Sequence, residues 1–528
     1  MIYLHRRETS MKEVINKIIN EKNTAILLFI FFAIQPLLDI YILFSEDVVN
    51  IFKFSPSTII RIVFVIFFII ATLFQHKFSI KKEKYILIYL ISVLIYFLFH
   101  HYNCLQLKTD LPGNFKYSTI AEIFYFIRML IPFVLIYVLY KQKFKKEHFY
   151  KIINIVVLVF SITIIVTNIF QTSLTSYGGD RVIKGNIFGW FTEAGRNLGH
   201  ELLASRGVFT SANQISALLL MLLAITFYRM LKEPTKLNVV TVSLQILTMI
   251  MLGTRVSSYG WIAVIASVFI FHLFFCFIKK EIKFNKNILI IIVVLSIPFT
   301  IIQLYSPILI RIYYPYVEPE LDINELREEL NYYLENMDEE KFVLTEDIEE
   351  FFKKSYAYFG VNPGYIMKDL YSYEADPVFW LQAMALDYNT ISGNRNHELL
   401  ITRRIFWLNN NEQDKLLGIG ASTLKDSGIY IEQDFRVHRY SIGSIGTILL
   451  FAPYFFILFK SLFIILTNYK KKFNMETIIF MFAISIAIIS SWLSGHVMDE
   501  LIVTIFIALI TARLLLNINE KDDEDAKS

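Results

Sequence analysis

Twelve long apolar runs constrain this 528-residue chain more than any other feature. A helix needs about 20 apolar residues to cross the hydrocarbon core of a bilayer. Charged residues make up only 19% of the chain, below the quarter that is usual in soluble domains. We therefore predict an all-α integral membrane protein of about twelve transmembrane helices, at 24–44, 57–74, 85–100, 119–140, 151–170, 205–228, 237–253, 257–278, 287–309, 441–466, 476–496 and 499–517.

Lys and Arg gather in every second connection between these runs, beginning with the stretch before the first run. Cytoplasmic loops of membrane proteins carry such an excess of basic residues. The alternation predicts that both termini are cytoplasmic, which agrees with an even number of spans. We expect a cytoplasmic N-terminus at 1–23 and a cytoplasmic tail at 518–528.

Two connections on the opposite side are too long to be simple turns, at 171–204 and 310–440. The second begins with an acidic stretch at 318–350, in which 323–330 has the apolar spacing of an amphipathic helix. We predict a folded, mostly helical extracytoplasmic domain between spans nine and ten. The domain boundaries that follow are spans one to nine at 24–309, the large loop at 310–440 and spans ten to twelve at 441–517.

Six ionisable residues lie in the outer half of the predicted runs or at their outer boundary, and the inner half holds almost none. Such residues are costly in lipid and are functional candidates by default. Arg128 lies about 13 Å along its helix, too deep to reach the headgroups easily, so it needs a carboxylate such as Glu122 or an anionic ligand. Asp39 is a candidate partner for Arg61 or Arg128. The alternative is that the shallower arginines are interfacial anchors. The outer-half residues are Asp39, Arg61, Glu122, Arg128, Arg206 and Arg255.

Several arginines without a metal motif suit a diphosphate ligand, because a guanidinium pairs with phosphate oxygens through two hydrogen bonds. The chain has no H-E-x-x-H, Walker loop or cysteine cluster, and it has no Asp-x-Asp outside the acidic C-terminal tail. We expect neither a cofactor nor a metal, and a net charge of +4 gives no reason to expect nucleic acid as a partner.

Four motifs, in this order and spacing, resemble the O-antigen ligase and polymerase superfamily. The stretch 205–214, with Arg206 and Asn213, is similar to the opening of a family span. The step at 253–257, with Arg255, looks like the end of the next one. The remaining likenesses are Asn394–Arg395 through Gly418-Ile419-Gly420 for the end of the outer loop, and Gly443-x-x-Gly446 for the following span. Pro36 to Asp39 and Ile59 to Arg61 further resemble members without a lipopolysaccharide context.

The resemblance implies a catalytic base from the outer loop, usually a histidine about eleven residues before the Gly-x-x-Gly. Glu432 occupies that position here, and His438 follows six residues later. A carboxylate can act as a general base when burial raises its pKa. We favour Glu432, with Asp434 orienting it or binding sugar, and keep His438 as the alternative base.

The resemblance implies a metal-independent, inverting glycosyltransferase on the outer face of the bacterial cytoplasmic membrane. It would polymerise or transfer an undecaprenyl-diphosphate-linked oligosaccharide for surface polysaccharide, with an acceptor glycan or lipid. Arg206 and Arg255, assisted by Arg128, would hold the diphosphate. Further substrate-binding candidates are Arg61, Asn213 and Arg395. A glycan flippase and a chain-length regulator are candidate partners, and polymerase and ligase stay open.

A different class, a transporter or flippase for an anionic or lipid-linked substrate, is the competing hypothesis. Twelve spans are common among transporters, and an arginine-lined cavity suits an anion. Against it, the two halves show no evident repeat and the intramembrane charges gather on one side. A sensor or scaffold would leave these arginines unexplained.

Overall fold

The computed structural model describes residues 19–52, 55–76, 78–177, 179–313, 323–338, 341–368, 370–429 and 431–519. Most of the predicted cytoplasmic N-terminus, the tail after 519 and part of the acidic stretch 318–350 lie outside these residues. The chain divides into two compact units. The first unit comprises Met1–Ser79, Arg128–Pro315 and Pro453–Ser528, and the second comprises Ile80–Ile127 and Tyr316–Ala452.

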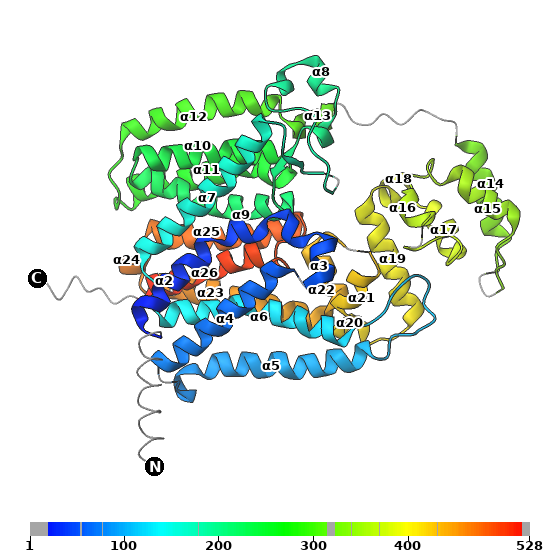
Figure 1. The fold of residues 1–528 in the computed structure, drawn as a ribbon, viewed down its shortest axis with the longest axis horizontal. Helices are drawn as coiled ribbons and strands as arrows, with labels where there is room; N and C mark the ends of the chain where they lie inside the picture. The colour runs from blue at the N-terminus through cyan, green and yellow to red at the C-terminus, as the bar shows by residue number, and fades with distance from the viewer. Residues whose placement is uncertain are drawn as a thin grey trace, which may run out of the picture. The chain divides into compact units, whose positions relative to one another are not determined.

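The first unit is a helical bundle with short irregular pieces (Figure 1). Its helices are α2 (Glu21–Ala33), α3 (Glu46–Phe52), α4 (Pro56–Gln75), α7 (Lys146–Ile169), α8 (Glu193–Arg196), α9 (Ala212–Lys232), α10 (Lys236–Leu252), α11 (Arg255–Leu273), α12 (Lys286–Leu304), α13 (Pro307–Tyr313), α24 (Tyr469–Lys472), α25 (Met475–Leu493) and α26 (Leu501–Asn519). Its tighter or wider turns are the 3-10 helices η1 (Gln35–Asp39), η2 (Tyr41–Phe44), η3 (Gly189–Phe191) and η4 (His200–Leu202), and the π-helix η5 (Phe274–Ile278). Helices α6 (Thr119–Lys141) and α23 (Gly443–Thr467) contribute residues to both units.

Helix α9 lies at the centre of the first unit. It packs against α7, α10, α11, α25 and α26 (Figure 1). Of the 18 residues that form its most apolar stretch, 94% are buried. Its sequence is apolar on every side, and a helix of this kind must be covered by protein or lipid. The scaffold of the unit therefore surrounds the helix that begins six residues after Arg206.

Ten of the twelve predicted spans, within the part of the chain that is described, are helices long and apolar enough to cross a membrane. The first run does not form a helix long enough to cross the membrane, because α2 has only 13 residues, about 20 Å, before 3-10 turns begin near Pro36. The run at 237–253 also forms too short a helix to count as a span, because α10 has 17 residues and is capped by Gly253, which has a left-handed backbone with φ 65°. The protein is a multi-pass membrane protein, with ten candidate spans among the residues that the structure describes.

The predicted all-α fold is confirmed, and a small sheet accompanies its helices. Strand β1 (Leu174–Thr175) pairs antiparallel with β2 (Ser205–Gly207). The sequence analysis assigned 205–228 to one span, yet α9 begins only at Ala212. Arg206 therefore projects from a short strand and not from the first turn of a membrane helix.

The second unit contains the helical segment between α12 and α23, which confirms the predicted helical character of the long connection. Its core is rich in aromatic side chains, with Trp380, Tyr371 and Phe352 almost fully buried. Leu326 and Leu330 are buried on α14, so the predicted amphipathic helix is confirmed. The helices are α5 (Ile80–Cys104), α14 (Asn324–Glu335), α15 (Glu346–Ser355), α16 (Pro363–Ile366), α17 (Pro377–Met384), α18 (Tyr388–Ile391), α19 (Asn394–Asn409), α20 (Asp414–Leu417), α21 (Ala421–Asp426) and α22 (Asp434–Ser441).

The two glycine motifs of the second unit pack against each other. A Cβ at Gly418 would collide with the carbonyl of Ser441, and one at Gly443 would collide with the backbone of Leu416. Both glycines have positive φ, which side chains other than glycine rarely adopt. The amide of Gly420 donates to the Ser441 carbonyl at 2.9 Å. These backbone contacts attach the end of α22 to the loop before α21.

Candidate functional site

Arg61 and Asp39 form the centre of a buried charged group in the first unit. Each side chain belongs to a residue that is only 2% exposed. Arg61 lies on α4, and its Nε donates to Oε1 of Gln35 at 2.8 Å. Asp39 ends η1 and interacts electrostatically with Arg61, one of its two candidate partners. The interior of the bundle thus holds a buried arginine and a buried carboxyl group where lipid or apolar packing would otherwise lie.

Arg128 reaches the same group from α6. Its Nη2 lies 3.6 Å from Oε2 of Glu500 and donates to the carbonyl of Asp499 at 3.0 Å. Glu500 and Arg128 also interact electrostatically with Arg61. The carboxylate partner of Arg128 is therefore Glu500 and not Glu122, which corrects the sequence-based expectation.

Glu122 has a structural role inside the second unit. Its carboxylate accepts the amides of Ala421 at 3.1 Å and Ser422 at 2.8 Å, at the start of α21. His100 Nε2 lies 2.9 Å from the same carboxylate, while His100 Nδ1 lies 2.6 Å from the carbonyl of Leu417. Both contacts are satisfied together when both ring nitrogens carry protons. Glu122 and His100 thereby connect α5, α6 and the loop before α21.

Arg206 lies on β2 and is 6% exposed. Its Nη2 donates to the carbonyl of Gly179, and its guanidinium carbon lies 5.5 Å from the ring centroid of Tyr41. Its buried Nε has no hydrogen-bond partner among the residues that the structure describes. The amide of Thr210 donates to the carbonyl of Asp39 at 3.0 Å, so the loop after Arg206 runs beside the segment that contains Asp39 and Tyr41.

Arg255 is the first residue of α11 and is exposed. Three residues that the sequence analysis missed gather near it. Tyr177 donates to the carbonyl of Gly253 at 2.7 Å and interacts electrostatically with Arg255. Arg311 Nη1 lies 3.5 Å from the Tyr177 hydroxyl, and the His200 ring centroid lies 5.0 Å from that of Tyr177. Burial lowers the pKa of His200, and nearby Arg311 lowers it further. No sequence motif linked these residues, because they come from three separate loops and helices.

His438 is buried on α22 of the second unit, with 1% of the residue exposed. Its Nδ1 lies 2.9 Å from the hydroxyl of Tyr125 on α6, and its ring packs edge-on against Phe451. Asp434, one turn earlier on α22, is fully buried. Tyr125 carries no motif and is 313 residues away in sequence, so sequence reasoning could not find it.

Glu432 lies in a more exposed environment than the sequence-based hypothesis requires. It accepts a hydrogen bond from Arg395 Nε in an ion pair, and the two side chains are 35% and 44% exposed respectively. The hypothesis that Glu432 is the base assumed a buried carboxylate. The Glu432 side chain is instead partly exposed and paired with Arg395. Asn213, the last predicted site residue, is the second residue of α9 and is half-buried.

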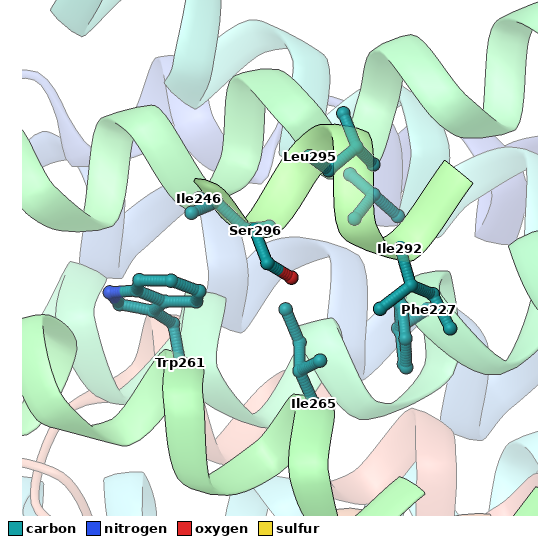
Figure 2. A pocket seen from close by; sticks show the side chains of 8 residues that line it. Phe227, Ile246, Trp261, Ile265, Ile292, Leu295 and Ser296 are labelled. Atoms are coloured by element: carbon teal, nitrogen blue, oxygen red, sulfur yellow. The ribbon is translucent and has the colours of Figure 1, made fainter. Parts of the chain in front are cut away.

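A small apolar cavity lies elsewhere in the first unit, among α9, α10, α11 and α12 (Figure 2). Its volume is about 10 Å³, room for about one water molecule. Trp261, Ile265 and Ile292 line it, and none of the predicted site residues does. A saccharide does not fit there.

The comparisons with known proteins identify the family. A family model described as O-antigen ligase like membrane protein matches residues 21–521, nearly the whole chain. A comparison with curated proteins returned no match. The matched residues include the helical bundle, the helical segment between α12 and α23, and the arginines described above. The chain therefore belongs to the O-antigen ligase-like membrane protein family, a family of membrane glycosyltransferases.

Proposed function

We propose that this protein transfers or polymerises a lipid-diphosphate-linked oligosaccharide in the assembly of surface polysaccharide. The observation that carries the proposal is the family match across residues 21–521. Family membership implies surface polysaccharide assembly and suggests lipid-linked glycan substrates. The donor in this proposal is an undecaprenyl-diphosphate-linked glycan, and the acceptor is a glycan or a lipid.

Arg206 and Arg255 bind the donor diphosphate in this proposal. Arg206 supports it because its guanidinium is almost buried and its Nε has no hydrogen-bond partner among the described residues. A diphosphate oxygen would satisfy that nitrogen with a charge-assisted hydrogen bond. Arg255 is exposed at the start of α11, where the helix dipole also favours an anion. We add Arg311 and Tyr177, which lie beside this end of α11, as further binding residues.

His438 takes the proton in this proposal, and Tyr125 positions it. When Nδ1–H donates to the Tyr125 hydroxyl, the basic lone pair lies on Nε2. The acceptor hydroxyl gives its proton to Nε2 while its oxygen forms a bond to the anomeric carbon. The bond from that carbon to the diphosphate oxygen breaks, and the lipid diphosphate leaves with the electron pair. Attack opposite the leaving group inverts the anomeric centre.

Stabilisation of the leaving diphosphate by arginine supplies most of the rate in this mechanism, because charge develops on the diphosphate oxygen as the bond breaks. No metal is required for that step when guanidinium groups carry the positive charge. The alternative base, Glu432, is paired with Arg395. Proton transfer to Glu432 would leave Arg395 without its counter-ion.

The basic connections on both sides of the domain, at 279–286 and 470–472, support cytoplasmic termini and an outward-facing domain at 310–440 as part of this proposal. The donor would then reach the protein laterally from the outer leaflet. Reporter fusions after 440 and after 519 would report opposite sides of the membrane if the domain and the tail lie as proposed.

The test is a transfer reaction with purified protein, an undecaprenyl-diphosphate-linked repeat unit and gel analysis of the products. A ladder of glycan lengths indicates a polymerase, and a single transfer to an added acceptor indicates a ligase. Arg206→Gln should lower kcat about 100-fold, as the loss of a charge-stabilising donor does elsewhere. Arg196→Gln is the matched control, because that arginine donates to the carbonyl of Trp190 and contacts none of the proposed site residues among those described. Equal activity in the two variants would refute the diphosphate assignment.

A further inference from the structure

The charged group in the first unit has buried polar atoms that no described residue satisfies. Asp39 Oδ2, Arg61 Nη2 and Arg128 Nε are buried without a hydrogen-bond partner in the described part of the chain. Asp39 and Arg61 are each only 2% exposed. Buried polar groups are almost always hydrogen-bonded, so three unsatisfied atoms in one group indicate a missing partner.

The composition of this group indicates the chemistry of that partner. It contains two guanidinium groups, of Arg61 and Arg128, and two carboxylates, of Asp39 and Glu500, so its net charge is zero when all four are ionised. The unsatisfied atoms are two donors and one acceptor. A diphosphate offers only acceptors and is repelled by both carboxylates. A sugar hydroxyl both donates and accepts, so it pairs with guanidinium and carboxylate alike.

We propose that Asp39, Arg61 and Arg128 form a subsite for the hydroxyl groups of the donor sugar that is attached directly to the diphosphate. This inference rests on the proposed function, and it assigns to these residues a ligand different from the diphosphate of Arg206. Glu500 holds Arg128 in place through their ion pair at 3.6 Å.

The position of the group in the chain supports this assignment. Thr210 donates its amide at 3.0 Å and its hydroxyl at 2.8 Å to the carbonyl of Asp39, which attaches Asp39 to the loop after Arg206. Tyr41 follows Asp39 by two residues, at most about 7 Å of chain. The Tyr41 ring lies 5.5 Å from the Arg206 guanidinium carbon. In a glycosyl diphosphate the first sugar is bonded to the phosphate, so its subsite must adjoin the diphosphate arginine.

A purely structural role makes a different prediction. If the group only joined α4, α6 and η1, with water on the unsatisfied atoms, the sugar would add nothing to binding. Substitutions in the group would then weaken every lipid ligand by the same factor. The decisive quantity is therefore the ratio of two affinities measured on one preparation, because a loss of folded protein cancels in that ratio.

The test measures Kd of the purified full-length protein for undecaprenyl diphosphate alone and for the same lipid bearing one hexose, one N-acetylhexosamine or one hexuronic acid. We expect at least one glycosylated lipid to bind about tenfold more tightly than the sugar-free lipid, since hydrogen bonds to charged groups contribute about that much. Arg128→Gln and Asp39→Asn should reduce this advantage to less than about threefold and leave the sugar-free lipid unchanged. Arg206→Gln should weaken all the lipids.

Equal binding of all lipids to the wild-type protein would overturn the inference and leave the proposed function intact. The same conclusion follows if Arg128→Gln or Asp39→Asn weakens the sugar-free and glycosylated lipids by one common factor. Absence of binding of any lipid to the wild-type protein, in contrast, would refute the proposed function itself.

Discussion

Replacing Tyr125 by Phe removes one hydroxyl from the protein and tests whether this tyrosine positions a catalytic base. The hydroxyl lies 2.9 Å from Nδ1 of His438, a residue that is 1% exposed. In the resting enzyme this is a hydrogen bond between neutral groups, which contributes about 1 kcal/mol. As His438 takes the proton it becomes an imidazolium, and a hydrogen bond from a charged donor contributes about 2 kcal/mol.

The difference, about 1 kcal/mol, is the part that acts on the transition state and not on the ground state. It corresponds to a fall in kcat of about fivefold, with KM for the lipid-linked donor unchanged. The matched control is Tyr89→Phe, which removes a hydroxyl that bonds the carbonyl of Leu449 at 3.2 Å on the neighbouring helix α5. We expect Tyr89→Phe to change kcat by less than about twofold.

The assay is steady-state transfer from an undecaprenyl-diphosphate-linked glycan, with kcat and KM determined separately and pH varied. Tyr125→Phe should also change the pH dependence of kcat, because the hydrogen bond stabilises the protonated ring. An unchanged kcat and pH profile in Tyr125→Phe would refute the reasoning. An equal loss in both tyrosine variants would assign Tyr125 a packing role only.

Two further predictions concern the second unit. Gly443→Ala should lower the unfolding temperature by several degrees, because the φ of +62° and the backbone of Leu416 leave no room for a Cβ. The control is Gly364→Ala, where the new Cβ would meet the side chain of Asn362 and not backbone; it should change the unfolding temperature little. Burial lowers the pKa of His397 in the folded protein, so the unfolded chain binds a proton at this residue more readily. The unfolding temperature should therefore fall as the pH drops below about 6.5, and it should fall less steeply in His397→Gln. Parallel pH profiles of the two proteins would contradict this prediction.

The sequence predicted the helices well because crossing a bilayer requires long apolar runs, and that requirement is visible in one dimension. The prediction was wrong where local backbone geometry ends a helix inside an apolar run. Pro36 removes an amide and lies where α2 has given way to 3-10 turns, and Gly253 ends α10 through a left-handed conformation. Neither breaks the apolar run, so neither shortened the predicted span.

The candidate site was harder to predict, because partners that are distant in sequence decide it. Arg128 was recognised as too deep to lack a partner, but that partner, Glu500, lies on the last connection of the chain. Glu432 and His438 are six residues apart and indistinguishable in a motif count. Burial separates them, and burial arises from packing that a single sequence does not encode locally.

We propose that His438 is the base in glycan transfer, and a comparison of three purified proteins tests this role. Purified wild-type, His438→Asn and Glu432→Gln proteins are compared in transfer from the same lipid-diphosphate-linked glycan to the same acceptor. We expect His438→Asn to lose at least about 100-fold in kcat, as the loss of a general base does. Glu432→Gln should stay within about threefold of wild type, because its partner is a partly exposed arginine. Loss of transfer in Glu432→Gln with transfer retained in His438→Asn would contradict the account.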